Sequence, residues 1–146
     1  MISVNNRDFL FTPIVDYLIS SEKVAHLQVG NNAEHALLVL TKTGYSALPV
    51  LDSKYHLKGL LGIGMITDSI LGLEHIEYER LADLKVDTIM QTDIPYIKTT
   101  DRFQKGLDLL INHPFLCVVE EDGTFAGILT RRVILKQFKK YIYSVE

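Results

Sequence analysis

The chain has 146 residues, 47% of them hydrophobic and 23% charged, and its formal net charge is −3. This profile is typical of one soluble globular domain, and the acidic balance argues against a protein that reads the phosphate backbone of nucleic acids through a basic face. The single cysteine, Cys117, excludes an internal disulfide and a zinc site built from cysteines.

The first half of the chain predicts five segments and a connector. The elements that we expect are, in order, a short helix over residues 12–19, an extended segment over 24–27, a helix from a cap at Asn31 or Asn32 to a stop at Gly44, strands over 46–51 and 58–63, and a helix over 65–71. Thr12 and Pro13 favour the start of the first helix. Residues 72–83 are acidic, contain Glu74, Glu77 and Glu79, and predict a structured connector.

The second half predicts the same order of elements. These are a short helix over residues 86–90, an extended segment over 94–97, a helix capped by Asp101, strands over 115–120 and 125–130, and a helix over 131–143. Residues 24–41 align with 94–111 without a gap, and residues 45–66 align with 113–134. A repeat of this length suits two half-domains that share one core, with a ligand cleft between them.

The doubled β-α-β-β-α order and two sequence segments resemble a tandem pair of CBS motifs, the Bateman module. The segments that carry this resemblance are GYSALPV at residues 44–50 and GILTRR at residues 127–132. The resemblance covers nearly all of residues 1–146 and implies an α/β fold. That fold is one pseudo-twofold module, which consists of a motif at about residues 12–71, the connector at 72–83 and a motif at about residues 84–143.

The Thr-Arg-Arg ending and the free-standing length resemble, more narrowly, the small CBS-pair proteins of Gram-positive bacteria that bind cyclic di-AMP. That resemblance implies a non-enzymatic sensor that needs no cofactor, holds an adenine nucleotide second messenger and pairs into homodimers. Similar proteins are thought to contact the stringent-response alarmone synthetase and pyruvate carboxylase. The same partners are therefore expected here by resemblance alone.

Two arginines occupy an unusual position in the predicted pattern. Arg131 and Arg132 follow a strand and begin a helix, where free amide hydrogens carry a partial positive charge and cations cost roughly 0.3 to 1 kcal/mol each. A phosphate would neutralise both guanidinium groups and the amides. The alternative is an ion pair with the acidic connector.

The remaining candidate ligand residues follow from the resemblance. Thr130 would donate its hydroxyl to phosphate, and Tyr45, Ser46 and Ala47 would frame adenine. Ala25 would leave room for the purine, and Lys23 could reach phosphate. The alternatives are a rim position for Tyr45, a structural role for the neighbouring His26 and a solvated side chain for Lys23.

Departures from the family pattern point to the ligand. CBS motifs that read a ribose diol show Gly-x-x-Thr-x-x-Asp, but the acid position is Met65 in the first copy and Val133 in the second, and Gly62 replaces the first threonine. A 3′,5′-cyclic dinucleotide offers no free diol and loses nothing by this. AMP or ATP would lose a contact worth roughly 1.5 to 3 kcal/mol. We expect one competent ligand site per chain.

No catalytic or metal-binding pattern is visible. The glycines of residues 59–64 lack the spacing of a dinucleotide loop and suggest strand flexibility instead, and residues 44–48 fail the nucleophile elbow. Residues 5–8 are polar where a signal peptide is apolar, and the longest apolar run is too short to cross a bilayer. A cytoplasmic cyclic di-AMP receptor is the leading hypothesis. The alternatives are a sensor of AMP, ADP or ATP and an interaction module with degenerate ligand sites.

Overall fold

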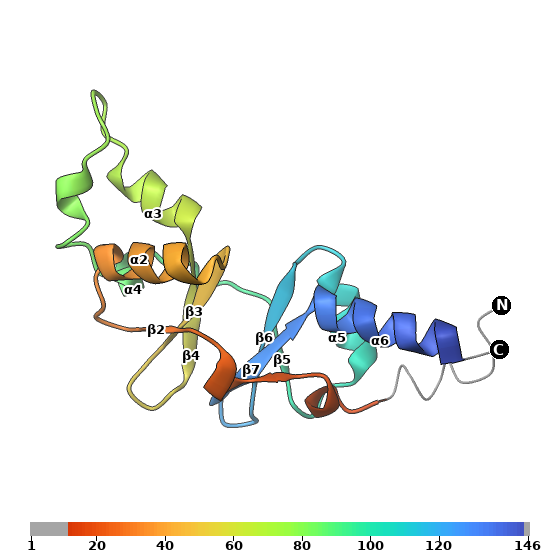
Figure 1. Cartoon of the computed structure of the whole chain (residues 1–146). Helices are drawn as coiled ribbons and strands as arrows, with labels where there is room; N and C mark the ends of the chain where they lie inside the picture. The colour runs from red at the N-terminus through yellow and green to blue at the C-terminus, as the bar shows by residue number, and fades with distance from the viewer. Residues whose placement is uncertain (1–11, 145–146) are drawn as a thin grey trace. The chain divides into compact units, whose positions relative to one another are not determined.

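Two β-sheets with flanking helices form the part of the chain that the computed structural model describes, residues 12–144 (Figure 1). The chain divides into two compact units. We call Ala25–Ile94 the central unit, and the stretches up to Val24 and from Pro95 onward together the terminal unit. The predicted α/β class is confirmed, and each unit takes a short segment from the opposite half of the repeat.

The central unit is built on a three-stranded sheet in the order β2-β3-β4, with β2 parallel and β4 antiparallel to β3. Its elements are β2 (Leu27–Gln28), α2 (Ala33–Thr43), β3 (Ala47–Leu51), β4 (Leu57–Gly62), α3 (Ile63–Ile70), the 3₁₀ helix η3 (Tyr78–Arg80) and α4 (Val86–Ile89). The segment that contains α4 belongs by sequence to the second copy of the repeat.

The terminal unit is built on a four-stranded sheet in the order β1-β7-β6-β5. Its elements are the 3₁₀ helix η1 (Ile14–Asp16), β1 (Ile19–Ser20), the 3₁₀ helix η2 (Ser21–Lys23), β5 (Tyr96–Lys98), α5 (Phe103–Leu110), β6 (Phe115–Val119), β7 (Phe125–Thr130) and α6 (Arg131–Ser144). Here η1, β1 and η2 come from the first copy.

The strand registers of the two units are the same at equivalent positions. Ala47 pairs with Gly62 in the central unit, as Phe115 pairs with Thr130 in the terminal unit. Each hairpin has its irregularity at the same place, between Val50 and Leu51 or between Val118 and Val119. The alignment read from the sequence therefore holds at the level of individual strand pairs.

The two hydrophobic cores are also equivalent. Leu27, Ala33, Leu40, Leu48, Val50, Leu61 and Ile66 of the central core align with Ile97, Phe103, Leu110, Leu116, Val118, Leu129 and Ile134 of the terminal core. Phe103 replaces a much smaller alanine and packs edge-on against Tyr17, with ring centroids 5.2 Å apart. Each unit thus buries apolar surface of its own, which is the main term stabilising a fold of this size.

Helix α2 has the two boundaries that its sequence predicts. The side chain of Asn32 accepts a hydrogen bond from the amide of His35 at 2.8 Å. Gly44 adopts a left-handed conformation, with φ at 73°, and its amide donates to the carbonyl of Leu40. Asparagine at the start and glycine at the end satisfy backbone groups that a helix otherwise leaves free.

Two predicted elements differ from the structure. The helix expected over residues 12–19 is only η1, because Ile19 and Ser20 pair with Ile128 and Gly127 as strand β1. The residue before α5 is Arg102 rather than Asp101, whose carboxylate instead accepts the amide of Lys98 at 2.7 Å. At residues 19 and 20 a pairing with the distant strand β7 overrides the local helix signal, whereas Asp101 makes a local contact with Lys98, three residues before it.

Equivalent glycines of the repeat admit the segments that come from the other copy. A Cβ at Gly127 would lie 2.0 Å from the carbonyl oxygen of Ile19, and one at Gly59 would lie 2.6 Å from that of Gln91. Leu60 and Gln91 exchange two backbone hydrogen bonds of 2.9 Å at this contact. The glycines permit close backbone packing, so the flexibility expected for residues 59–64 is not their role at Gly59.

We expect Gly127→Ala to destabilise the protein by at least about 2 kcal/mol, because a methyl group would clash with backbone at a position where φ is 148°. Gly123→Ala is the control, since Gly123 also has positive φ, at 92°, but a Cβ there would have no atom within 4 Å. It should cost only about 1 to 2 kcal/mol. Urea unfolding measures both, and equal losses would refute a role for the clash.

Candidate functional site

The segment expected to frame adenine begins where α2 ends. Gly44 turns the chain after the helix, so Tyr45 and Ser46 precede β3 and Ala47 is its first residue. The Tyr45 side chain is 42% exposed, Ser46 is also exposed, and Ala47 is half-buried. An aromatic ring, a hydroxyl and a small apolar side chain are therefore presented in sequence at one end of the central sheet.

Ala25 lies at the same end of this sheet. Strand β2 runs parallel to β3 with Leu27 opposite Val50, so extending the register back by two residues sets Ala25 level with Leu48, next to Ala47. Ala25 is half-buried and packs on the central core. The ring of its neighbour His26 lies against Tyr55 at a centroid distance of 5.5 Å. The structure thus places Ala25 at the same end of the sheet as residues 45–47.

Close packing at Gly62 explains why the central unit has a glycine where the terminal unit has Thr130. Gly62 pairs with Ala47, and a Cβ at Gly62 would lie 3.1 Å from the carbonyl oxygen of Ser46. This is tight enough that the Tyr45–Ala47 segment would have to shift to admit a threonine. The glycine leaves α3 without a side-chain cap.

The segment expected to bind phosphate joins β7 to α6 in the terminal unit. The hydroxyl oxygen of Thr130 accepts the amide of Val133 at 3.1 Å and so caps α6. The amide of Arg131 donates to the carbonyl of Pro114, also at 3.1 Å. Since the fold already uses these two amides, an anion here would depend on side chains more than on the helix end. The hydrogen of the Thr130 hydroxyl remains available, because only its oxygen is used in the cap.

Arg131 takes a structural role that the sequence does not reveal. Its Nε donates to the carbonyl of Leu110 at 2.7 Å and one of its terminal nitrogens donates to that of Ile111 at 2.9 Å. These carbonyls end α5, where a cation is favoured by the helix dipole. The fold therefore already uses two N–H groups of Arg131, and its predicted phosphate contact remains a prediction.

The surface beside Arg131 is also unsuited to phosphate. A hollow of about 170 Å³ lies between α5 and α6, and Arg131 shares its wall with apolar side chains. These are Leu107, Leu110, Ile111, Ile134 and Leu135.

Arg132 is exposed, as Arg131 is, but the contacts of the two side chains differ. Within the terminal unit, counting only residues that the structure describes, the side chain of Arg132 has no hydrogen bond or ion pair. The first turn of α6 contains no acidic residue. Its charge is therefore not neutralised by its own unit, and an anion can bind without displacing a protein contact.

Lys23 lies toward the other end of β7. It ends η2, which packs beside β7. Because β1 is antiparallel to β7, the chain after Ser20 proceeds toward the first residues of β7 and away from Thr130. The structure does not group Lys23 with Arg131 and Arg132, and its predicted phosphate contact remains a prediction.

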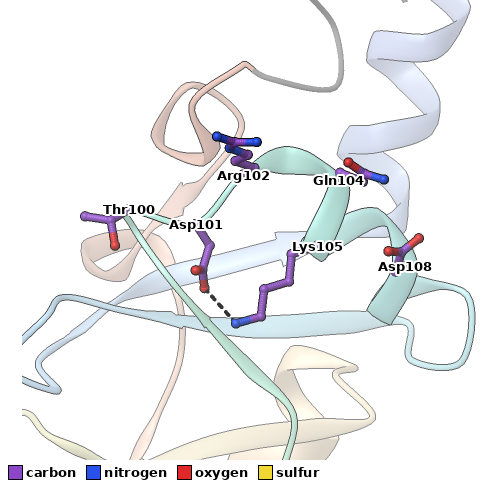
Figure 2. A pocket seen from close by; sticks show the side chains of 6 residues that line it. All are labelled: Thr100, Asp101, Arg102, Gln104, Lys105 and Asp108. Atoms are coloured by element: carbon purple, nitrogen blue, oxygen red, sulfur yellow. Dashed lines mark hydrogen bonds and ion pairs between the residues drawn. The ribbon is translucent and has the colours of Figure 1, made fainter. Parts of the chain in front are cut away.

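A second hollow, of about 480 Å³, surrounds the start of α5 and was not predicted from the sequence (Figure 2). Its walls are Thr100, Asp101, Arg102, Gln104, Lys105 and Asp108. Lys105 and Asp101 point toward one another and form an ion pair of 3.2 Å, drawn dashed in Figure 2. The four-residue spacing of this pair is its only signal in the sequence, and the ion pair neutralises two of the charged groups that line the hollow.

A thiol nucleophile and a metal centre each require a particular arrangement of side chains. Burial raises the pKa of the Cys117 thiol to about 12, so it is a poor nucleophile near neutral pH. No cluster of three or more metal-ligating side chains occurs among residues 12–144. Within the same residues, no helix is long and apolar enough to span a bilayer.

Comparison with known proteins gives consistent matches. The CBS domain family matches residues 86–140. Cyclic di-AMP receptor B of Bacillus subtilis (strain 168) is 50% identical over 145 residues, which is 99% of both chains. The crystal structure of CbpB from Listeria monocytogenes in complex with c-di-AMP is 57% identical, with a TM-score of 0.84 over 90% of this chain and 98% of that one. A CBS domain-containing protein of unknown function from Bacillus anthracis str. Ames Ancestor is also 57% identical, with a TM-score of 0.84 over 92% and 97%.

We expect Arg131→Ala to lower the free energy of unfolding by about 1 to 2 kcal/mol, because two charge-assisted hydrogen bonds to α5 are lost at a partly exposed position. Arg132→Ala should change it by less than about 0.5 kcal/mol. Urea denaturation of the matched pair measures the difference. Equal effects would show that the contacts of Arg131 do not stabilise the fold.

Proposed function

Because this chain belongs to the CBS domain family, we propose that it is a non-catalytic cytoplasmic receptor for cyclic di-AMP that regulates a partner protein according to occupancy. The observation that carries this proposal is the exposed guanidinium of Arg132 beside the capping residue Thr130, with no partner for that guanidinium among the described residues of its unit. The names of its relatives support the choice of ligand, since one is a cyclic di-AMP receptor and another was crystallised with c-di-AMP.

The terminal unit would recognise the phosphate. Arg132 supplies the charge and a planar fork of donors that matches two phosphate oxygens. Thr130 supplies a hydroxyl hydrogen that its own cap does not use. Arg131 would contribute a third contact only through those N–H groups that do not already donate to the carbonyls of Leu110 and Ile111. Lys23 would add positive charge from the other end of β7.

The central unit would recognise adenine. Tyr45 is exposed enough to lie against a base, and the small side chains of Ala47 and Ala25 leave room at the same end of the sheet. Ser46 would offer polar groups to the edge of the base. Aromatic and small apolar groups with a few polar atoms are typical of purine sites.

Missing ribose readers favour a cyclic dinucleotide over a mononucleotide. The side chains at the two acid positions of the motif, Met65 and Val133, are apolar and half-buried. Met65 packs on the central core. Neither can accept hydrogen bonds from a ribose diol, which AMP, ADP and ATP carry and a 3′,5′-cyclic dinucleotide lacks.

Regulation would act through contacts that differ between the free and bound states, since a ligand shifts an equilibrium only by its differential affinity. We propose that the chain acts as a homodimer without a cofactor. We also propose that it contacts the stringent-response alarmone synthetase or pyruvate carboxylase when the nucleotide is absent. An interaction module with degenerate ligand sites is the second candidate, and the structural use of Arg131 is the observation that favours it.

Arg132→Ala should weaken cyclic di-AMP binding about tenfold to a hundredfold, because a charge-assisted contact worth about 1.5 to 3 kcal/mol is lost. Isothermal titration calorimetry measures the change. Lys140→Ala, an exposed position two turns further along α6, should stay within about twofold of the unmodified protein. Undiminished binding by the Arg132 variant would remove Arg132 from the site, and absence of measurable binding by the unmodified protein would support the degenerate module.

Cyclic di-AMP should bind at least about tenfold more tightly than AMP, ADP or ATP, since those ligands must bury a ribose diol without its usual acceptor. A thermal-shift panel of adenine and guanine nucleotides should therefore show its largest stabilisation with cyclic di-AMP. A larger shift with AMP would replace the ligand proposed here by a mononucleotide.

A further inference from the structure

The acidic connector forms an ordered hairpin. After α3 the chain extends away from the helices of the central unit and returns at η3 (Figure 1). Leu71 and Ile76 form an antiparallel bridge, and the amide of Gly72 donates to the carbonyl of His75 at 2.9 Å. The amide of Glu77 donates to the carbonyl of Ile70 at 2.7 Å. We call residues 71–76 the connector hairpin.

Arg80 fixes the base of this hairpin. Its guanidinium donates to the carbonyl of Ser69 at 2.9 Å and lies 3.8 Å from the carboxylate of Glu77. Gly72 is needed at the turn, because a Cβ there would lie 2.8 Å from both His75 O and Glu77 Oε1. The hairpin is thus held in one conformation by contacts on both sides of its base.

The tip of the connector hairpin presents an apolar side chain that has no role in the fold. Leu73 is fully exposed, although its own backbone is part of an ordered turn. Three further large apolar side chains near it are exposed, namely Leu71, Ile76 and Tyr78. An apolar cluster of this kind on a preorganised loop binds at low entropic cost, which is the property of an interface anchor.

Acidic side chains, some paired and some not, occur in the same segment as this apolar cluster. Glu77 pairs with Arg80, and Glu79 lies 3.4 Å from His75. Glu74 and Asp83 have no side-chain hydrogen bond or ion pair to any residue that the structure describes. Residues 72–83 carry four carboxylates against one arginine, so the cluster lies in a field of net negative charge.

We propose that the connector hairpin docks a partner protein by inserting Leu73 into an apolar pocket bordered by lysine or arginine side chains. A second copy of this chain is a poor occupant, because a twofold interface would bring the same acidic patch of both chains together. This inference rests on the proposed function, since the partner is the regulated enzyme proposed above. It adds the surface that meets that enzyme.

Leu73→Gln tests the docking directly. Binding of the purified full-length chain to purified alarmone synthetase and to pyruvate carboxylase is measured by biolayer interferometry without nucleotide. Leu73→Gln should weaken binding to the responding enzyme at least tenfold, and Glu74→Lys at least threefold with a weaker dependence on salt. Leu38→Gln, an exposed leucine on α2 of the same unit, is the matched control and should stay within twofold.

Several outcomes would overturn the docking proposal. The proposal fails if Leu73→Gln binds the enzyme as tightly as the unmodified chain does, or if Leu38→Gln loses as much affinity as Leu73→Gln. It also fails if the unmodified chain binds neither enzyme. A change in the self-association of Leu73→Gln during sedimentation would identify a second copy as the occupant instead. Calorimetry with cyclic di-AMP on the same variants separates the two proposals, because unaltered nucleotide binding with failed docking leaves the receptor function standing.

Discussion

Close backbone contact at one glycine in each sheet is the constraint on which both units depend. At Gly127 the carbonyl of Ile19 occupies the space that any side chain would need, and at Gly59 the carbonyl of Gln91 does the same. In each case the approaching segment comes from the other copy of the repeat. The terminal unit therefore consists of two separate stretches of chain, and the central unit, although continuous, includes a segment of the second copy. Both units depend on a backbone contact that only glycine permits.

The Thr-Arg-Arg segment shows how one short motif divides its work between folding and recognition. Thr130 caps α6, and Arg131 stabilises the end of α5 through two backbone carbonyls. Arg132 is left exposed at a helix start, and no described residue of its unit neutralises its charge, which is unfavourable until an anion binds. The same hydrogen bonds that fix the position of the segment therefore leave one cation ready for a ligand, and this arrangement is the structural basis of the proposed receptor function.

Local signals in the sequence predict the elements that are decided locally. Asn32 and Gly44 bound α2 as expected, and the repeat alignment matches the strand registers, because caps and periodicity depend on neighbouring residues. The helix expected over residues 12–19 is mostly absent, since the pairing of Ile19 with Ile128 involves a residue more than a hundred positions away. For the same reason the sequence cannot tell Arg131 from Arg132. The carbonyls that bind Arg131 reach it only when α5 and α6 have packed together.

The composition of the two sheets indicates how such a chain could have arisen. In a protein with a single copy of the repeat, the edge strand that contains the glycine would have no segment beside it. An open edge of this kind favours pairing with another chain. Two such proteins could each close that edge by swapping their leading segments, which is a low-cost route to a dimer. Gene duplication and fusion would then have joined the swapped pair end to end. The connector hairpin lies between the two copies in the sequence and would mark the point at which they were joined.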